Sequence, residues 1–400
     1  MARLQIYDAR ERVLVRTADA ALRLVAAVPR ALRGRKHASE PARILLLRLE
    51  RIGDLVMALP AIRDVRTLAP TAEIDLLVGS WNASLAKAIP HVSRVETVDA
   101  RWLAREGEGL GLGALLMAAR SWKRRRYDLA INFEPDIRSN LMLAASGADR
   151  TAGWANGGGG AALDLALDYD PASHTSLNAR RLVATAFARQ PAESAKPLLT
   201  IPDSALSAAA ERLRSARGRR VAGVHVSGGR PIKQWDLARF ADVAARLADT
   251  RGAAIVATGG PGDRALVDAF KASLAPRPVI DASDGAPGSD LLSSAALLAK
   301  LDVLVTGDTG PMHLASAVGT PVVAIFGPSD PARYATSGPL DRIVRVDLPC
   351  SPCNRIRRPP DRCIGHTPDC LTHVAEDDVF AAAAAVLDAS GARMSGAGRS

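Results

Sequence analysis

Short apolar runs alternate with amphipathic stretches along most of this chain, and that alternation limits the folds it can adopt. The apolar runs at residues 44–47 and 74–78 suit buried strands, and residues 55–68 between them show helical spacing of apolar side chains. A strand, a helix and a second strand in this order are typical of a βαβ unit, whose two strands lie parallel. The pattern therefore predicts an α/β protein built on parallel sheets.

The alternation pauses in a proline-containing stretch at residues 191–203 and then starts again. Since a chain of 400 residues exceeds the usual size of one hydrophobic core, we expect two α/β domains. The predicted segments are a basic N-terminal helix and linker (1–40), an N-terminal Rossmann-like domain (41–195), a C-terminal Rossmann-like domain (196–345), a cysteine-rich loop with a closing helix (346–390) and a disordered tail (391–400). The closing helix is expected to return across the first domain.

Basic side chains outnumber acidic ones. The chain has 52 Lys and Arg against 42 Asp and Glu, which gives a formal net charge of +10. Such an excess favours an anionic partner, which could be nucleic acid, a phosphorylated substrate or a membrane surface. Aromatic residues make up only 4% of the chain, so a nucleic-acid partner recognised by base stacking is disfavoured.

The first forty residues carry part of this charge. Apolar residues recur at helical spacing from Val13 to Val28, interleaved with arginines. The predicted amphipathic helix can lie on an anionic membrane surface or pack its apolar side on its own domain, and the sequence leaves both open. Because neither a membrane-spanning run nor a secretory signal is evident, we expect a cytoplasmic protein that this helix can attach to the cytoplasmic face of the inner membrane.

All four cysteines fall between residues 350 and 370, so disulfides do not link the rest of the chain, and a reducing compartment is expected. Cys350 and Cys353 have the spacing of a zinc-binding pair, but Cys363 and Cys370 lie too far apart in sequence for an ordinary zinc ribbon. Reduced or redox-labile thiols in a loop are therefore favoured over a bound metal ion.

Ligands of open parallel sheets bind beyond the carboxyl ends of the strands, so the loops that follow strands are the places to search. The first such loop leads through Gly53 and Asp54 into a helix. Gly53 allows close approach of the backbone to a ligand. Asp54 can cap the helix or act as a general base, and its position alone favours the cap.

Three loops of the second domain combine small residues with polar or charged ones. Their candidate ligand-binding residues are Ser227, Gly228 and Lys233, then Gly259, Gly260 and Asp263, and finally Asp308, Thr309, Gly310 and His313. Lys233 can attract a phosphate or be an ordinary surface lysine. Asp263 can bind a ribose hydroxyl or cap the next helix.

The last of these loops gives the strongest signal. Thr309 is expected to cap the helix that follows, and the unpaired N–H groups of the first helical turn then form an anion site. His313, one turn into that helix, is expected on its exposed face, where it is either structural or a ligand contact. The chain has no Gly-x-x-x-x-Gly-Lys-Ser/Thr loop, no Gly-x-Ser-x-Gly elbow and no His-Glu-x-x-His pair, which disfavours the enzyme classes that use them.

Several short blocks, taken in order, resemble the family 9 glycosyltransferases, the lipopolysaccharide heptosyltransferases. The blocks are RILLLR (43–48), IGD (52–54), LPAIR (59–63), VHVSGGR (224–230), KQW (233–235), TGGP (258–261), GDTGPMHLA (307–315), GTPV (319–322) and FGPSDP (326–331). The resemblance extends over about residues 42–390. It implies a GT-B architecture, in which two Rossmann-like domains face each other across a cleft.

The same resemblance implies a chemistry. An ADP-activated heptose is the implied donor, bound by the C-terminal domain, and an anionic glycolipid is the implied acceptor, bound by the N-terminal domain. Asp54 would be the base for an inverting transfer, while Lys233 and the helix terminus at Thr309 would stabilise the leaving group without a metal ion. The expected acceptor contacts are Gly53, Arg63 and Arg138.

Other functions stay open at this point. No residue in these loops identifies heptose, so the enzyme could be a transferase of this family for another nucleotide sugar and glycan. A sugar-nucleotide epimerase and a non-catalytic nucleotide-sugar-binding protein share the architecture. The chain departs from the family's pattern at the nucleoside contact, because Gly262 falls near the position where the family has an acidic residue and Asp263 follows it.

Overall fold

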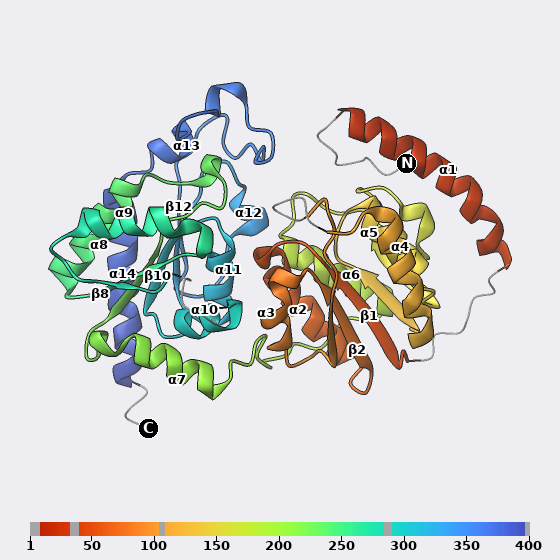
Figure 1. Ribbon diagram of the computed structural model, residues 1–400, viewed down its shortest axis with the longest axis horizontal. Coiled ribbons are helices and arrows are strands. Elements are labelled where there is room, and N and C mark those ends of the chain that lie inside the picture. The colour runs from red at the N-terminus through yellow and green to blue at the C-terminus, as the bar shows by residue number, and fades with distance from the viewer. Residues whose placement is uncertain (1–8, 33–39, 104–108, 284–289, 397–400) are drawn as a thin grey trace. The chain divides into compact units, whose positions relative to one another are not determined.

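The computed structural model describes residues 9–32, 40–103, 109–283 and 290–396 (Figure 1). The chain divides into two compact units, Met1–Thr200 and Ile201–Ser400. Each unit contains one six-stranded sheet in which all paired strands run parallel. The predicted α/β class is therefore confirmed.

The sheet of the first unit has the order β3-β2-β1-β4-β5-β6. Its strands are β1 (Arg43–Arg48), β2 (Glu73–Val78), β3 (Arg94–Thr97), β4 (Leu129–Asn132), β5 (Arg150–Trp154) and β6 (Leu165–Leu167). Every residue of β1 after Arg43 is buried, which explains its continuous apolar run. The strands predicted at residues 44–47 and 74–78 correspond to β1 and β2 to within one residue at each end.

Helices cover both faces of this sheet. They are α2 (Ile52–Leu68), α3 (Ala83–Lys87), α4 (Leu112–Ser121), α5 (Ile137–Ala145) and α6 (Thr175–Phe187). Leu45 and Leu47 share one hydrophobic cluster with Leu115 of α4 and Met142 of α5. Since side chains alternate along a strand, the remaining buried residues of β1 point to the opposite face, where α2 packs against α6.

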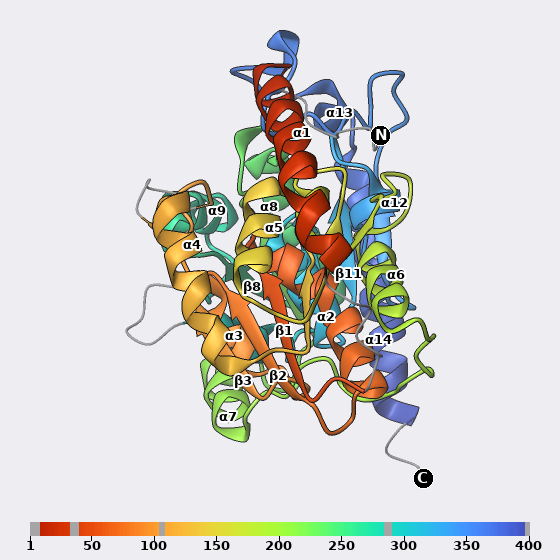
Figure 2. The same cartoon turned by 90° about the vertical axis from the view of Figure 1, so that its right-hand side faces the viewer.

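Helix α1 (Ala9–Leu32) confirms that the N-terminal segment is helical (Figure 2). Val15 is 8% exposed, and the Asp19 carboxylate accepts a hydrogen bond from the Gly159 N–H at 2.8 Å. The opposite side of the helix is uncovered, because Val13 and Leu14 are 62% and 70% exposed. The predicted basic linker lies outside the described residues. Among the helices of the described ranges, none is long and apolar enough to cross a bilayer.

The sheet of the second unit has the order β12-β11-β10-β7-β8-β9. Its strands are β7 (Val221–His225), β8 (Ala254–Thr258), β9 (Val279–Asp281), β10 (Val303–Gly307), β11 (Val322–Ile325) and β12 (Arg342–Val344). Its helices are α7 (Asp203–Arg212), α8 (Leu237–Arg251), α9 (Arg264–Leu274), α10 (Leu291–Leu298), α11 (Gly310–Ala317), α12 (Pro331–Tyr334), α13 (Asp369–Thr372) and α14 (Glu376–Gly396).

Helix α14 corrects two expectations. It packs on α8 and on β10, β11 and β12, and Val379, Val386 and Leu387 belong to the core of the second unit. The expected return across the first domain is therefore wrong. The helix also continues to Gly396, so residues 391–396 are helical and not a disordered tail. An acidic first turn and a run of alanines, the best helix formers, favour this long helix.

The cysteine-rich loop forms a pocket of its own in the second unit. All four cysteines line it, together with Ile232, Pro328 and Pro360. Each thiol is free, and no group of three or more His, Cys, Asp or Glu side chains in the described part of the chain is arranged to hold a metal ion. Cys350 is exposed and Cys370 is buried. Burial, reinforced by the neighbouring thiols, raises the pKa of Cys370 to about 11.

This difference predicts how the thiols react. With a pKa of about 11, roughly one Cys370 thiol in a thousand is ionised at pH 8, and the thiolate is the reactive form. We expect iodoacetamide at pH 8 to modify Cys350 first and Cys370 last, as measured by mass spectrometry of the labelled peptides. Denatured protein, in which the four sites should react at similar rates, is the control. Equal labelling of Cys350 and Cys370 in the folded protein would contradict the prediction.

Candidate active site

Asp54 lies near the carboxyl edge of the first sheet, in the first turn of α2. The Arg51 N–H donates a hydrogen bond to its Oδ2 at 3.2 Å. Arg51 is the N-cap residue of α2 and Asp54 is at the third helical position, so the interpretation of Asp54 as the N-cap is wrong, although its carboxylate does hold the start of the helix. Arg48 Nη2 lies 3.3 Å from its Oδ1. The side chain is still 30% exposed, which leaves the carboxylate accessible to a ligand.

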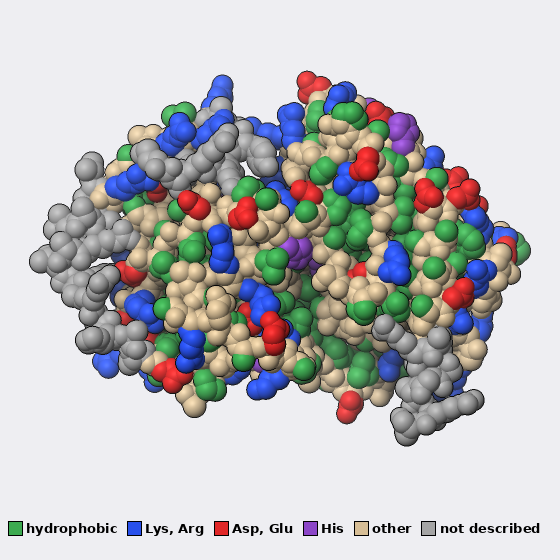
Figure 3. Space-filling view, turned by 180° about the vertical axis from the view of Figure 1, so that it is seen from behind, with side chains coloured by type: hydrophobic (Ala, Val, Ile, Leu, Met, Phe, Trp, Pro, Cys, Tyr) green, Lys and Arg blue, Asp and Glu red, His purple; other side chains and the backbone are tan. Residues whose placement is uncertain are grey.

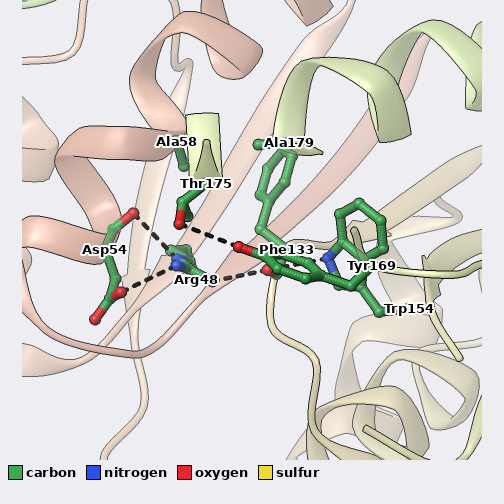
Figure 4. Close-up of a pocket in the computed structure, with 8 residues that line it drawn as sticks. All are labelled: Arg48, Asp54, Ala58, Phe133, Trp154, Tyr169, Thr175 and Ala179. Carbon is green, nitrogen blue, oxygen red and sulfur yellow. Dashed lines mark hydrogen bonds and ion pairs between the residues drawn. The ribbon is translucent and has the colours of Figure 1, made fainter. Parts of the chain in front are cut away.

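Behind Asp54 lies a small pocket that contains a buried arginine (Figure 4). The pocket is lined by Arg48, Asp54, Ala58, Phe133, Trp154, Tyr169, Thr175 and Ala179. Arg48 is 3% exposed and donates to the carbonyl oxygen of Phe133 at 2.7 Å, the same oxygen that accepts from Trp154 Nε1 at 3.2 Å. Burial alone would lower the pKa of Arg48, but the carboxylates around it raise that pKa above its ordinary value.

A buried acid, Glu134, also lies near Arg48. Glu134 is 1% exposed and accepts hydrogen bonds from the Leu49 N–H and the Ser139 hydroxyl. Burial raises the pKa of Glu134, while Arg48 and these hydrogen bonds oppose the rise. Sequence analysis had assigned no role to Arg48 or Glu134. The sequence did contain a signal for Arg48, which is a charged residue at the end of an otherwise apolar strand. A charge can be buried there only if it is paired.

The three expected acceptor contacts lie in different surroundings. Gly53 is buried in the first turn of α2, next to Asp54. Arg138, at the start of α5, pairs with Asp136 and lies 4.4 Å from the ring centroid of Trp102. Arg63 is nine residues beyond Asp54, about 13 Å along the helix, and donates to the Lys196 carbonyl at 3.2 Å. The structure does not bring Arg63 together with Asp54.

The candidate residues of the second unit do meet at one edge of its sheet. β7 lies between β8 and β10, and His225 at the end of β7 is level with Thr258 on one side and Thr306 on the other. The loops that follow these three strands therefore leave the sheet side by side. These loops and the start of α11 carry all ten candidates, from Ser227 to His313.

Lys233 and Asp308 connect two of these loops through an ion pair. Lys233 Nζ donates to Asp308 Oδ2 at 2.8 Å, and the side chains are 19% and 9% exposed. Burial would raise the pKa of Asp308, but Lys233 and His313 hold it below its ordinary value. Asp308 is therefore ionised at neutral pH, and it fixes the ammonium group of Lys233 at the loop edge.

Two details of the Asp308 loop differ from the sequence prediction. Thr309 occupies the cap position of α11, but its side chain makes no capping hydrogen bond and instead lies 3.2 Å from the hydroxyl of Thr306. The first turn, which begins at Gly310, therefore lacks a side-chain cap. His313 is only 7% exposed, so its expected place on the exposed face of the helix is wrong, because that side of the helix packs towards the buried Asp308.

The two glycine loops are held by local contacts. Asp263 Oδ2 accepts from the Gly260 N–H at 2.8 Å, so the carboxylate caps the turn at Pro261–Asp263. A Cβ atom on Gly228 would lie 2.7 Å from the Gln234 nitrogen, so only glycine permits this close approach. In the same loop, the Gly229 N–H donates a hydrogen bond to Ser227 Oγ at 3.3 Å.

Comparison with known proteins gives one consistent answer. The model of glycosyltransferase family 9 (heptosyltransferase) matches residues 116–362, more than half of the chain. Lipopolysaccharide heptosyltransferase 1 of Pseudomonas aeruginosa is 25% identical over 323 residues, which cover 78% of this chain and 86% of that protein.

Solved structures show the same fold. The Escherichia coli ADP-heptose lipopolysaccharide heptosyltransferase II aligns with a TM-score of 0.70 at 20% identity and covers 86% of this chain and 98% of that one. The E. coli heptosyltransferase WaaC with ADP-2-deoxy-2-fluoro heptose aligns with a TM-score of 0.59 at 20% identity, over 76% of this chain and 93% of that one. The chain therefore has the GT-B fold and belongs to glycosyltransferase family 9, and it is a glycosyltransferase.

Proposed function

We propose that this enzyme transfers heptose from ADP-heptose to a lipopolysaccharide core or a similar anionic glycolipid. The main support from the geometry is the Asp54 carboxylate, which is accessible yet held at the carboxyl edge of the first sheet. Relatives that match most of this chain are lipopolysaccharide heptosyltransferases, and a structural neighbour binds an ADP-heptose analogue. The positive net charge suits both a diphosphate donor and an anionic acceptor.

In the proposed reaction, Asp54 takes the proton from an acceptor hydroxyl as its oxygen attacks the anomeric carbon of the donor. A new carbon–oxygen bond forms on the face opposite the departing ADP, so the configuration inverts. The bond between the anomeric carbon and the phosphate oxygen breaks, and its electron pair leaves with ADP. The first unit would bind the acceptor, with Gly53 and Arg138 near Asp54.

The second unit would bind the donor. Lys233 and the uncapped N-terminus of α11 supply positive potential where negative charge develops on the leaving diphosphate, and this proposal needs no metal ion. Gly228 lets the loop after β7 fold closely against the backbone at Gln234, which shapes this side of the proposed donor site.

Replacing Asp54 by Asn tests the proposed base. The amide keeps the shape of the side chain and can still accept the Arg51 hydrogen bond, but it cannot take a proton. We expect kcat to fall about 100-fold or more while the donor still raises the melting temperature of the variant. The rate is measured as ADP release in the presence of acceptor, and donor binding is measured by thermal shift.

Asp128→Asn is a matched control. Like Asp54, Asp128 holds backbone N–H groups of the same unit, since it accepts from Ala42 and Arg43 at 2.8 Å each, but it lies at the start of β1. The Asp128→Asn variant should retain normal turnover.

Normal turnover in Asp54→Asn would refute the mechanism. Stabilisation by UDP- or GDP-sugars instead of ADP-heptose would point to another donor, and release of epimerised sugar nucleotide without acceptor would identify an epimerase.

Replacing Lys233 by Met tests the proposed leaving-group contact. Loss of the ammonium group should lower kcat about 100-fold and weaken inhibition by ADP. Lys271→Met is the matched control, because Lys271 also forms a 2.8 Å ion pair with an aspartate, Asp281, in the same unit. Equal kinetic losses in both variants would mean that Lys233 acts only through stability.

We also propose a cytoplasmic enzyme that attaches peripherally to the inner membrane through α1. One side of this helix packs on its own unit through Val15 and Asp19, which matches one of the two interpretations of the sequence. The other side presents Val13 and Leu14, flanked by the exposed Arg10 and Arg16. An apolar strip beside arginines is suited to an anionic bilayer surface, where a glycolipid acceptor resides.

The double variant Val13→Glu/Leu14→Glu tests this attachment without removing the packed side of α1. It should abolish sedimentation with vesicles containing one quarter anionic phospholipid, while transfer to a soluble acceptor is retained. Leu177→Glu, which changes a 57% exposed residue of the same unit, should leave vesicle binding unchanged. Removal of residues 1–38 should also reduce binding, and unaltered sedimentation of these variants would refute the proposal.

A further inference from the structure

Arg48 donates two of its hydrogen bonds to a single residue, Asp54. Its Nε donates to the backbone oxygen of Asp54 at 3.1 Å, and its Nη2 donates to the Asp54 carboxylate at 3.3 Å (Figure 4). The same guanidinium donates to the Phe133 carbonyl at 2.7 Å and pairs with Glu50 at 2.8 Å. Strand β1, the end of strand β4 and the first turn of α2 are therefore joined through one planar group.

These contacts leave the Asp54 side chain little freedom. Arg48 engages Oδ1 and the Arg51 N–H engages Oδ2, so neither carboxylate oxygen can turn without breaking a hydrogen bond. The backbone of Asp54 is held by the same guanidinium. An exposed carboxylate would otherwise sample several rotamers, and each would place its lone pairs differently with respect to an acceptor hydroxyl.

The guanidinium is itself fixed from behind. Its side chain is 4% exposed, which keeps it out of bulk water. Glu134 contributes negative charge beside Arg48 and is held by the Leu49 N–H and the Ser139 hydroxyl. A lysine could supply the charge but not the fork of parallel N–H donors that reaches both Asp54 atoms at once.

We propose that Arg48 is a positioning residue for catalysis, which orients the Asp54 carboxylate towards the acceptor hydroxyl. This inference rests on the proposed role of Asp54 as the base. It assigns Arg48 no contact with donor or acceptor, so its effect on the reaction must pass through Asp54. Because the effect of Arg48 must pass through Asp54, an experiment can distinguish this positioning role from a purely structural one.

A double-mutant cycle tests the dependence. Arg48→Gln alone should lower kcat about 10- to 100-fold and leave the KM for the donor within about twofold, because misplacement of the base affects only the chemical step. In the Asp54→Asn background, Arg48→Gln should lower kcat less than twofold further, because no base remains to be oriented. Arg48→Lys should regain part of the lost rate. If Asp54→Asn turnover is below detection, Asp54→Glu serves as the background. In that background, too, Arg48→Gln should lower kcat less than it does in the unmodified protein.

Arg66→Gln is the matched control for loss of a partly buried arginine that donates several hydrogen bonds. Arg66 lies on α2 and donates to the backbone oxygens of His91, Pro70 and Ala72, so its loss should lower the melting temperature without lowering kcat.

Two results would overturn the proposal. One is a normal kcat in Arg48→Gln. The other is a double variant whose fold-loss in kcat equals the product of the losses in Arg48→Gln and Asp54→Asn. If Arg48→Gln fails to fold, Arg48→Lys replaces it throughout the cycle. Normal turnover of Asp54→Asn is a distinct outcome, since it refutes the base itself.

Discussion

Parallel strand pairing determines where chemistry can occur in this protein. Each helical crossover returns the chain to the same end of the sheet, so the loops that follow neighbouring strands all leave from one edge. In the second unit this brings together the loops after β7, β8 and β10, although Ser227 and His313 are far apart in sequence. In the first unit it brings the end of β1, with Arg48, beside the end of β4, with Phe133. The candidate residues are thus collected by backbone hydrogen bonds before any side chain contributes.

At these edges, buried charges are held by opposite charges on a different element. Lys233 lies against Asp308, and Arg48 lies among Glu50, Asp54 and Glu134. Such pairs add little net stability, because desolvation offsets much of the attraction, yet removing one partner is costly. Their main effect is geometric, since each pair fixes the position of a group that we propose to face a ligand. A site built this way is ordered before substrate binds, which reduces the entropy lost on the way to the transition state.

Sequence patterns predicted β1 and β2 well, because each is a nearly continuous buried run that differs sharply from its flanks. Edge elements such as β6 and β12 have three residues each and are partly exposed, so they lack that signal. Asp54 and Lys233 could be selected from their loops and from resemblance to a family. Arg48 could not be given a role, because its partners Phe133 and Glu134 are more than 80 residues away in sequence. The same limit applies to His313 and α14, whose burial depends on the tertiary partners that periodicity does not identify.

Part of the surplus positive charge is carried by residues other than the site candidates. Arg48 and Lys233 are each neutralised by adjacent carboxylates, so they contribute little to the long-range field. On the face shown in Figure 3, basic and acidic side chains are interspersed. Helix α1, by contrast, has five arginines against Glu11 and Asp19, a net charge of 5 − 2 = +3 out of the +10 of the whole chain. Attraction between the exposed Arg10, Arg16 and Arg23 of this helix and an anionic surface is screened by salt, with a Debye length of about 8 Å at physiological ionic strength. The buried pairs are screened much less. Recruitment to an anionic acceptor and alignment of the reacting groups can therefore respond differently to ionic strength, because the first depends on exposed charges and the second on buried ones.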